Sequence, residues 1–337
     1  MQRREVFGRD RAKMMQQSDA LWYVSSGQVE LRPGIVDTLR DGDVLIGARY
    51  SAISRGTERL VLRGHIPSTE HDRMRCPHQE GSFPFPVKYG YAVVGKILAG
   101  PADRIGQAVF ALHPHQRQFC IPSEQAHIIP EGLPFRRATL AANMETALNI
   151  VWDAGIAPGD HVLIIGGGTV GILTAALAAR SAGTRVTIVD IDPSRAGLAE
   201  KVGAQFALPY TAPAEQDVVI HTSASEEGLR LALSCAGIEA RVIEASWYGD
   251  KDIKLNLGEA FHSRRLKLLS SQVGTVPAHQ RARWPTSRRL KVALELLCNS
   301  VFDALLTQDI AFDDAPAQLA QALAADSSGL TTVLTYT

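Results

Sequence analysis

A glycine-rich turn limits what this chain can fold into more than any other feature. Residues 166–171 read Gly-Gly-Gly-Thr-Val-Gly and satisfy the pattern Gly-x-Gly-x-x-Gly. The turn follows an apolar stretch, residues 161–165, that is typical of a buried strand, and it opens a strongly apolar stretch with helical length, residues 170–182. A glycine pattern placed between a strand and a helix is the context in which chains bind a dinucleotide.

Each glycine of this pattern has its own physical task. Gly166 permits the tight turn, Gly168 lets the backbone approach a pyrophosphate, and Gly171 lets the helix pack closely against the strand. The first helical residues, Thr169 and Val170, then offer unpaired N–H groups and the positive end of the helix dipole to the phosphates.

An acid at the end of the next strand indicates which dinucleotide is bound. Asp190 follows the apolar residues 185–189 and lies 19 positions beyond Gly171. A carboxylate there accepts both ribose hydroxyls of NAD and repels the additional phosphate of NADP. Arg195 can counter that repulsion, so NAD is predicted and NADP is disfavoured. The alternative is a glycine-rich turn beside a surface aspartate.

Strands and helices alternate over the second half of the chain. Strand-like segments are predicted at residues 161–165, 185–189, 217–222, 241–245 and 267–271, and helices at 136–152, 170–182, 193–202 and 225–233. Such alternation favours an α/β fold with a doubly wound parallel sheet of the Rossmann type. We therefore predict a Rossmann NAD(P)-binding domain over residues 142–270.

The first half of the chain reads differently. Short strands broken by Gly and Pro recur between residues 20 and 129, which predicts a mostly β, barrel-like domain over 19–141, completed by residues 271–337. Residues 1–18 mix arginines with acids and lack the apolar centre of a secretion signal, so they are interpreted as a flexible extension.

Composition excludes several classes of partner. Lys+Arg and Asp+Glu both number 35, so no net field attracts nucleic acid or an anionic membrane, and a small-molecule substrate is expected. The cysteines, Cys76, Cys120, Cys235 and Cys298, lie far apart and form no Cys-x-x-Cys pair, which favours reduced thiols in a cytoplasmic enzyme. No apolar run approaches the ~20 residues that span a bilayer.

Taken with the glycine turn, three further segments resemble the medium-chain dehydrogenase/reductase superfamily of alcohol, sorbitol and threonine dehydrogenases. They are Ala-Pro-Gly-Asp at 157–160, Gly-Tyr-Ala-Val-Val-Gly at 90–95, and Ile-Ser-Arg-Gly-Thr-Glu at 53–58. The last is most similar to bacteriochlorophyllide dehydrogenase-like and other alcohol dehydrogenase-like proteins. The resemblance covers residues from about 20 to the end, and implies a GroES-like β-barrel-type catalytic domain, NAD(P)-linked oxidoreductase activity and a homodimer.

The chain departs from the zinc enzymes of that superfamily at the positions that hold the metal. Ser54 or Arg55 stands where they carry a Cys, Tyr91 and Ala92 stand where they carry His and Glu, and residue 141 or 142, both Ala, stands at the last ligand. A catalytic zinc needs about three protein ligands. The resemblance is therefore to a zinc-independent member, with no metal predicted.

Without zinc, a hydrogen-bond donor must polarise the reacting oxygen. The Tyr91 hydroxyl is the leading candidate for general acid/base, with Lys88 as the cation that lowers its pKa; the alternative is a packed strand residue. Ser54 or Thr57 can relay a proton, and Arg55 can hold an acidic substrate group, or the segment simply begins a helix.

Two features leave alternatives open. Glu145, near the expected hinge of the cleft, either contacts nicotinamide or substrate, or stabilises its own helix. His113 and His115 flank a proline and invite a metal interpretation, but no third ligand has convincing spacing, so substrate contact or loop surface is favoured.

Three functions compete. The favoured one is a zinc-independent, NAD-linked dehydrogenase or reductase acting on an alcohol/carbonyl pair or an activated double bond. A methyltransferase that uses S-adenosylmethionine also has a glycine-rich βαβ unit, but the preceding β domain disfavours it. The third is a dinucleotide-binding protein that lost its chemistry together with the zinc ligands.

Overall fold

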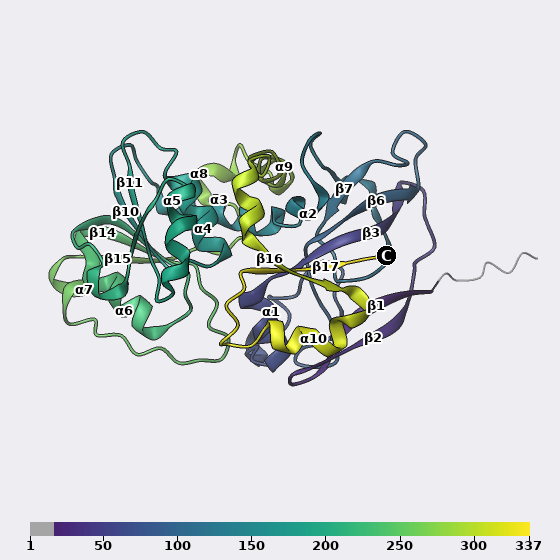
Figure 1. Cartoon of the computed structure of the whole chain (residues 1–337), viewed down its shortest axis with the longest axis horizontal. Helices are drawn as coiled ribbons and strands as arrows, with labels where there is room; N and C mark the ends of the chain where they lie inside the picture. Colours follow the sequence, from purple (N-terminus) through teal and green to yellow (C-terminus); the bar gives the residue numbers. More distant parts are fainter. Residues whose placement is uncertain (1–16) are drawn as a thin grey trace, which may run out of the picture.

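The computed structural model describes residues 17–337, which form two halves on either side of a cleft (Figure 1). The flexible extension predicted for residues 1–18 lies outside the described residues up to residue 16, and residues 17 and 18 already belong to strand β1. Among residues 17–337, no helix combines the length and the apolarity that crossing a membrane would need.

One half is built on a six-stranded parallel sheet with the order β12-β11-β10-β13-β14-β15. Its strands are β10 (His161–Ile165), β11 (Arg185–Val189), β12 (Gln205–Ala207), β13 (Gln216–His221), β14 (Ala236–Glu244) and β15 (Lys267–Ser270). The strand order reverses between β10 and β13, which is where doubly wound sheets bind their ligands. The α/β Rossmann fold predicted from the alternation is confirmed.

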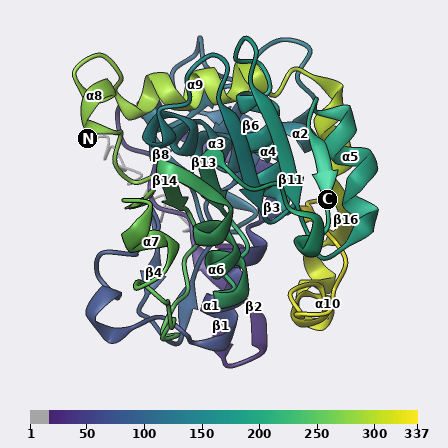
Figure 2. The same ribbon diagram turned by 90° about the vertical axis from the view of Figure 1, so that its left-hand side faces the viewer.

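Helices cover both faces of this sheet (Figure 2). They are α3 (Ala141–Ala154), α4 (Thr169–Ala178), α5 (Ala196–Lys201) and α6 (Glu226–Cys235). Outside them, α7 (Ala260–Ser263) packs on α6 and α9 (Thr286–Leu296) packs on α3. Because successive strand residues point to opposite faces, Val162 and Ile164 pack in the core with α3 and α4, whereas Leu163 and Ile165 pack in the core with α6.

The other half contains two sheets. Six strands of the seven-stranded sheet follow the order β16-β17-β3-β6-β7-β9, and the seventh strand, β8, pairs with β3. The four-stranded sheet has the order β2-β1-β5-β4. The strands are β1 (Gln17–Ser25), β2 (Gln28–Ile35), β3 (Asp43–Ile53), β4 (Glu80–Gly81), β5 (Val87–Lys88), β6 (Val93–Ala99), β7 (Ala108–Ala111), β8 (Gln118–Pro122), β9 (His127–Ile128), β16 (Leu306–Ala311) and β17 (Thr331–Thr335).

The end of the chain returns to this first half. Strand β17 pairs with β3 in antiparallel fashion, Leu334 opposite Ser51, so residues far apart in sequence complete one sheet. Short helices complete this half: α1 (Arg55–Arg63), α2 (Phe135–Ala138) and α10 (Ala315–Ala322). Helix α8 (Ala278–Arg281) precedes α9 along the chain. The cleft therefore has one wall from each half and a rim from the C-terminal segment.

Candidate active site

The cleft between the two halves has a volume of about 1090 Å³. Ser54, Thr57 and Tyr91 line it from the first half, and the glycine turn lines it from the Rossmann half. The loops after β13 and β14 and residues 325–331 complete its wall. A cavity of this size, lined by backbone amides and a few polar side chains, is suited to a dinucleotide and a small substrate.

The glycine turn has the geometry of a phosphate cradle. Gly166 adopts φ +111°, which favours glycine, and a Cβ on Gly171 would lie 1.9 Å from the Gly166 carbonyl oxygen. A Cβ on Gly168 would instead meet nothing within 4 Å, so the space above this residue is open. Helix α4 begins at Thr169, next to Val170, without a side-chain cap, which leaves its first N–H groups available to an anion.

Asp190 stands beside the turn as predicted. Its carboxylate accepts hydrogen bonds from Gly167 N at 2.5 Å and Asp192 N at 2.8 Å, so its position is set by backbone on both sides. Arg195 lies next to it, pairs with Asp192 at 3.2 Å and donates to the Ser328 carbonyl at 2.6 Å. An acid and an arginine therefore both line the cleft beside the glycine turn.

Tyr91 is brought together with Ser54 and Thr57 in the cleft. Burial raises the pKa of Tyr91 to about 12, against the hydrogen bonds from Ser54 and Thr57, which lower it. Ser54 is the residue before helix α1, but its side chain makes no cap hydrogen bond. The helix-start interpretation is thus right for the position of Ser54, and its hydroxyl is one of the groups that lower the pKa of Tyr91.

Lys88 is not brought to the cleft, and its predicted role as the cation beside Tyr91 is wrong. Its side chain is only 3% exposed, and its ammonium donates to Glu80 and, at 2.8 Å, to Gln116 Oε1. It lines a separate cavity of about 230 Å³. Adjacency in sequence misled here because Lys88 lies on β5, which pairs with β1 and β4 and not with the sheet that carries the cleft.

Glu145 does not line the cleft either. It is 5% exposed and accepts a hydrogen bond at 2.9 Å from Arg289 of α9, whose guanidinium also reaches Asn149 at 2.5 Å and the Val273 carbonyl at 2.6 Å. Burial raises the Glu145 pKa, and Arg289 opposes that shift. The prediction that Glu145 binds cofactor is therefore corrected: it holds α3 and α9 together.

A buried network supports the loop that carries Ser54. The Glu58 carboxylate is fully buried and accepts from Ser54 N at 2.7 Å, Tyr23 OH at 2.5 Å and His115 Nε2 at 3.0 Å. His115 also bonds Ser51 at 2.7 Å. His115 is therefore a partner of Glu58 inside the domain, while His113 stacks on Phe119 with ring centroids 3.7 Å apart. Both imidazoles are buried and neither lines the cleft, so the expectation of substrate contact or loop surface is wrong for both.

Arg55 does not face the cleft with a free guanidinium. It donates to the carbonyls of Ser327 and Gly329 and, at 3.2 Å, of Ala324. Its pKa is lowered, first by burial and then by the neighbouring charges of Arg59 and Arg195. Arginines from both halves therefore hold the C-terminal segment over the rim of the cleft.

The residues at the superfamily's zinc position do not fit a zinc ion. Residues 17–337 contain no group of three or more His, Cys, Asp or Glu side chains arranged to hold a metal. The side chains that stand there, Ser54, Tyr91 and Ala92, offer hydroxyls and a methyl group where zinc prefers thiolate, imidazole or carboxylate. No step of the chemistry is therefore derived through a metal.

Comparisons with known proteins show which families and relatives this chain is similar to. Residues 141–234 match the family model "Alanine dehydrogenase/PNT, C-terminal domain". The chain is 24% identical over 305 residues to D-guloside 3-dehydrogenase of Escherichia coli (strain K12), covering 81% of this chain and 87% of that protein.

Solved structures share the whole two-domain fold. An alcohol dehydrogenase from E. coli CFT073 complexed with NADH superposes with a TM-score of 0.74 at 15% identity, covering 95% of this chain and 99% of that one. A Sinorhizobium meliloti 1021 protein bound to NADP gives a TM-score of 0.74 at 20% identity, with the same coverage. Both are similar to this chain in fold, and each holds a nicotinamide dinucleotide.

Proposed function

We propose that this chain, which has the fold of the medium-chain dehydrogenase/reductase superfamily, is a zinc-independent oxidoreductase that interconverts a small alcohol and its carbonyl compound with NAD(H). The coarser assignment, an NAD(P)-linked oxidoreductase of the alcohol dehydrogenase type, has the support of the relatives, which are named dehydrogenases and reductases. The open cradle above Gly168, beside Asp190, is the observation that carries the proposal.

The residues present fit a nicotinamide dinucleotide. The amides at the start of α4 would hold its diphosphate and the Asp190 carboxylate its adenosine ribose. When bound, the nicotinamide supplies the acceptor or donor of hydride. The chain's own part is to position the substrate, exclude water and handle the proton.

Tyr91 is assigned to the substrate oxygen. Because its pKa is raised to about 12, the hydroxyl keeps its proton at neutral pH and acts as a hydrogen-bond donor. Ser54 and Thr57 fix its orientation, so the donor is held in place before substrate arrives. This replaces the polarising role that a metal ion plays in other dehydrogenases.

The proposal is tested by titrating NADH into the protein and then measuring NADH formation from NAD+ with a panel of polyols and glycosides, sorbitol and methyl β-D-glucoside included. Binding with turnover supports the oxidoreductase. Binding without turnover of any alcohol, ketone or enone favours the dinucleotide-binding protein, and no binding of NADH or NADPH overturns the assignment. A homodimer and a cytoplasmic location stay predictions.

Asp190→Ser is expected to change the choice of dinucleotide. Loss of hydrogen bonds between a charged acceptor and the ribose should raise the Kd for NADH by roughly 10- to 100-fold. The Kd for NADPH should fall, because the repulsion of its phosphate is removed while Arg195 stays beside it. Fluorescence titration with both dinucleotides measures this. An unchanged ratio of the two Kd values would show that Asp190 does not contact the ribose.

Tyr91→Phe is expected to lower kcat by about 100-fold, the usual effect of removing one hydrogen-bond donor from the reacting oxygen. The ring still packs, and the lost hydrogen bonds to Ser54 and Thr57 cost only about 1 kcal/mol of unfolding free energy. Steady-state kinetics and thermal unfolding separate the two effects. If Tyr91→Phe kept the full wild-type kcat, Tyr91 would be only a packed residue without a role in catalysis.

A further inference from the structure

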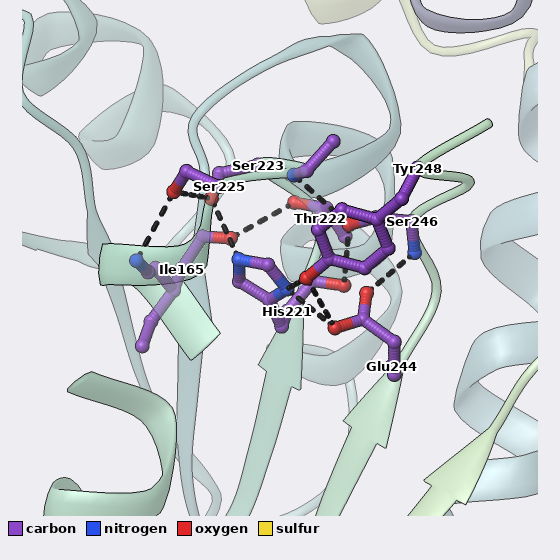
Figure 3. Close-up of polar contacts among 10 residues, drawn as sticks. Ile165, His221, Thr222, Ser223, Ser225, Glu244, Ser246 and Tyr248 are labelled. Carbon is purple, nitrogen blue, oxygen red and sulfur yellow. Dashed lines mark hydrogen bonds and ion pairs between the residues drawn. The ribbon is translucent and has the colours of Figure 1, made fainter. Parts of the chain in front are cut away.

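A chain of polar side chains lies behind the cleft where β13 and β14 end (Figure 3). The fully buried His221 ring contacts Ser223 Oγ through Nε2 at 2.7 Å and Glu244 Oε2 through Nδ1 at 2.7 Å. Glu244 also accepts from Tyr248 OH at 2.9 Å and Ser246 N at 2.7 Å. A serine, a histidine and a carboxylate are thus linked in the order of a nucleophile, a base and an orienting acid.

The surroundings decide which atoms carry the protons. Burial and the Glu244 charge raise the pKa of Tyr248, so its hydroxyl is a donor to that carboxylate. With Glu244 as acceptor, Nδ1 of a neutral His221 carries the hydrogen and Nε2 is left as an acceptor. Ser223 therefore donates to Nε2 and accepts from Ser225 Oγ at 2.8 Å, so one lone pair of its oxygen is left for a ligand.

Only the serine end of this chain reaches the cleft. Ser223 is exposed and lines the cleft, next to Gly166, whereas His221 does not line it. The residue after the serine, Ala224, adopts φ +52°, a left-handed conformation that is strained for alanine and often marks functional sites.

Helix α6 leaves space for this contact. A Cβ on Gly228 would lie 2.5 Å from Ser223 Oγ and 2.6 Å from His221 Nε2. The glycine at this point of the helix is what allows the two side chains to meet. Glu244 of β14 and Tyr248 of the following loop are the titratable side chains in hydrogen-bond contact with His221 among residues 17–337.

The loop that carries Tyr248 also reaches the other wall of the cleft. Trp247 packs against the hydrophobic core of the first half, as does Tyr91, and Asp250 pairs with His65 at 3.0 Å. The side chains that orient His221 are therefore tied to the wall from which Tyr91 faces the substrate.

We propose that Ser223, His221 and Glu244 form a proton-accepting triad on the Rossmann wall of the cleft, with Ser223 as the catalytic residue and the other two as positioning residues. This inference rests on the proposed function. In alcohol oxidation the C–H bond gives its hydride to the nicotinamide, and the hydroxyl proton must go to the protein. Ser223 Oγ takes that proton as its own passes to His221 Nε2, and the imidazolium formed is balanced by the Glu244 carboxylate. Carbonyl reduction runs the same transfers backwards.

Activation of the serine is tested without any substrate. Diisopropyl fluorophosphate should modify Ser223, as detected by peptide mass spectrometry, and NADH should protect it. Ser234 is the matched control, because it is exposed on α6, the helix that follows the Ser223 loop, and it donates to the Leu231 carbonyl. Glu244→Gln and Gly228→Ala should each slow the modification at least about tenfold. No label on Ser223, or equal labelling of Ser234, overturns the activated serine.

Use of the triad is tested with Ser223→Ala, an exposed and conservative change. Oxidation of sorbitol or methyl β-D-glucoside should fall about 100-fold in kcat, while the Kd for NADH changes less than about twofold.

Three outcomes contradict the relay. Full kcat of Ser223→Ala shows that another group takes the proton. A rise in the NADH Kd that accounts for the whole loss shows that Ser223 only binds cofactor. A labelled Ser223 in a wild-type protein that oxidises no probe overturns the oxidoreductase itself and leaves only the activated serine.

Discussion

Gly168→Val is expected to raise the Kd for NADH by at least about 100-fold, because its side chain would occupy the open space that the diphosphate needs. The fold should tolerate the change. Gly168 has φ −74° and ψ −178°, which suits a β-branched residue, and the poorer helix cap should lower Tm by no more than about 4 °C. Calorimetric titration and thermal unfolding of the same sample measure both effects.

Gly171→Ala is the matched control for this experiment. Its Cβ would lie 1.9 Å from the Gly166 carbonyl oxygen, so α4 must move away from the strand and Tm should fall clearly. Gly168→Val is thus expected to lose NADH binding while it stays folded, whereas Gly171→Ala is expected to lose stability. If Gly168→Val bound NADH with the wild-type Kd, the diphosphate would not lie at this turn. The main support of the proposed function would then be lost.

Arg289→Met is expected to reduce the free energy of unfolding by about 3–5 kcal/mol, because it leaves the Glu145 carboxylate buried without its partner. For a domain of this size that corresponds to a fall in Tm of about 6–20 °C. Both side chains are nearly inaccessible, 2% exposed for Arg289 and 5% for Glu145, so water cannot replace the lost contacts. Urea unfolding of the intact chain measures the change.

The pH dependence of this variant has a definite sign. Burial already raises the Glu145 pKa, and loss of the opposing guanidinium raises it further. Such a carboxyl has a higher pKa in the folded than in the unfolded protein. Its contribution to the free energy of unfolding is fully present below the unfolded pKa and is lost as the pH rises through the folded pKa. Arg289→Met should therefore be less destabilised near about pH 5 than near about pH 8.

The control is the double variant Glu145→Met/Arg289→Met, which removes both charges and should recover most of the stability. If the single variant were as stable as the wild type at both pH values, the ion pair would contribute nothing to the contact between α3 and α9. NADH binding by these variants, measured below their Tm, should stay unchanged, because neither side chain lines the cleft.

Of the side chains to which we assign proton handling, one could be found from the sequence and one was missed. Tyr91 was predicted from its place in a motif, and the structure places it with Ser54 and Thr57 in the cleft. His221 was missed, although it is a polar residue at the carboxyl end of an apolar strand, the edge at which parallel sheets bind ligands. That signal was available, but its partner Glu244 lies 23 residues away on another strand.

The glycine turn, the α4 start and Asp190 could be predicted because their geometry is local: φ angles, a helix end and a strand end follow from a few neighbouring residues. The surroundings of Lys88, Glu145 and His221 were decided only by the tertiary structure. A buried charge or imidazole takes whichever partner the packing of distant elements brings to it, and Arg289 reaches Glu145 across 144 positions. Sequence spacing does not encode that proximity.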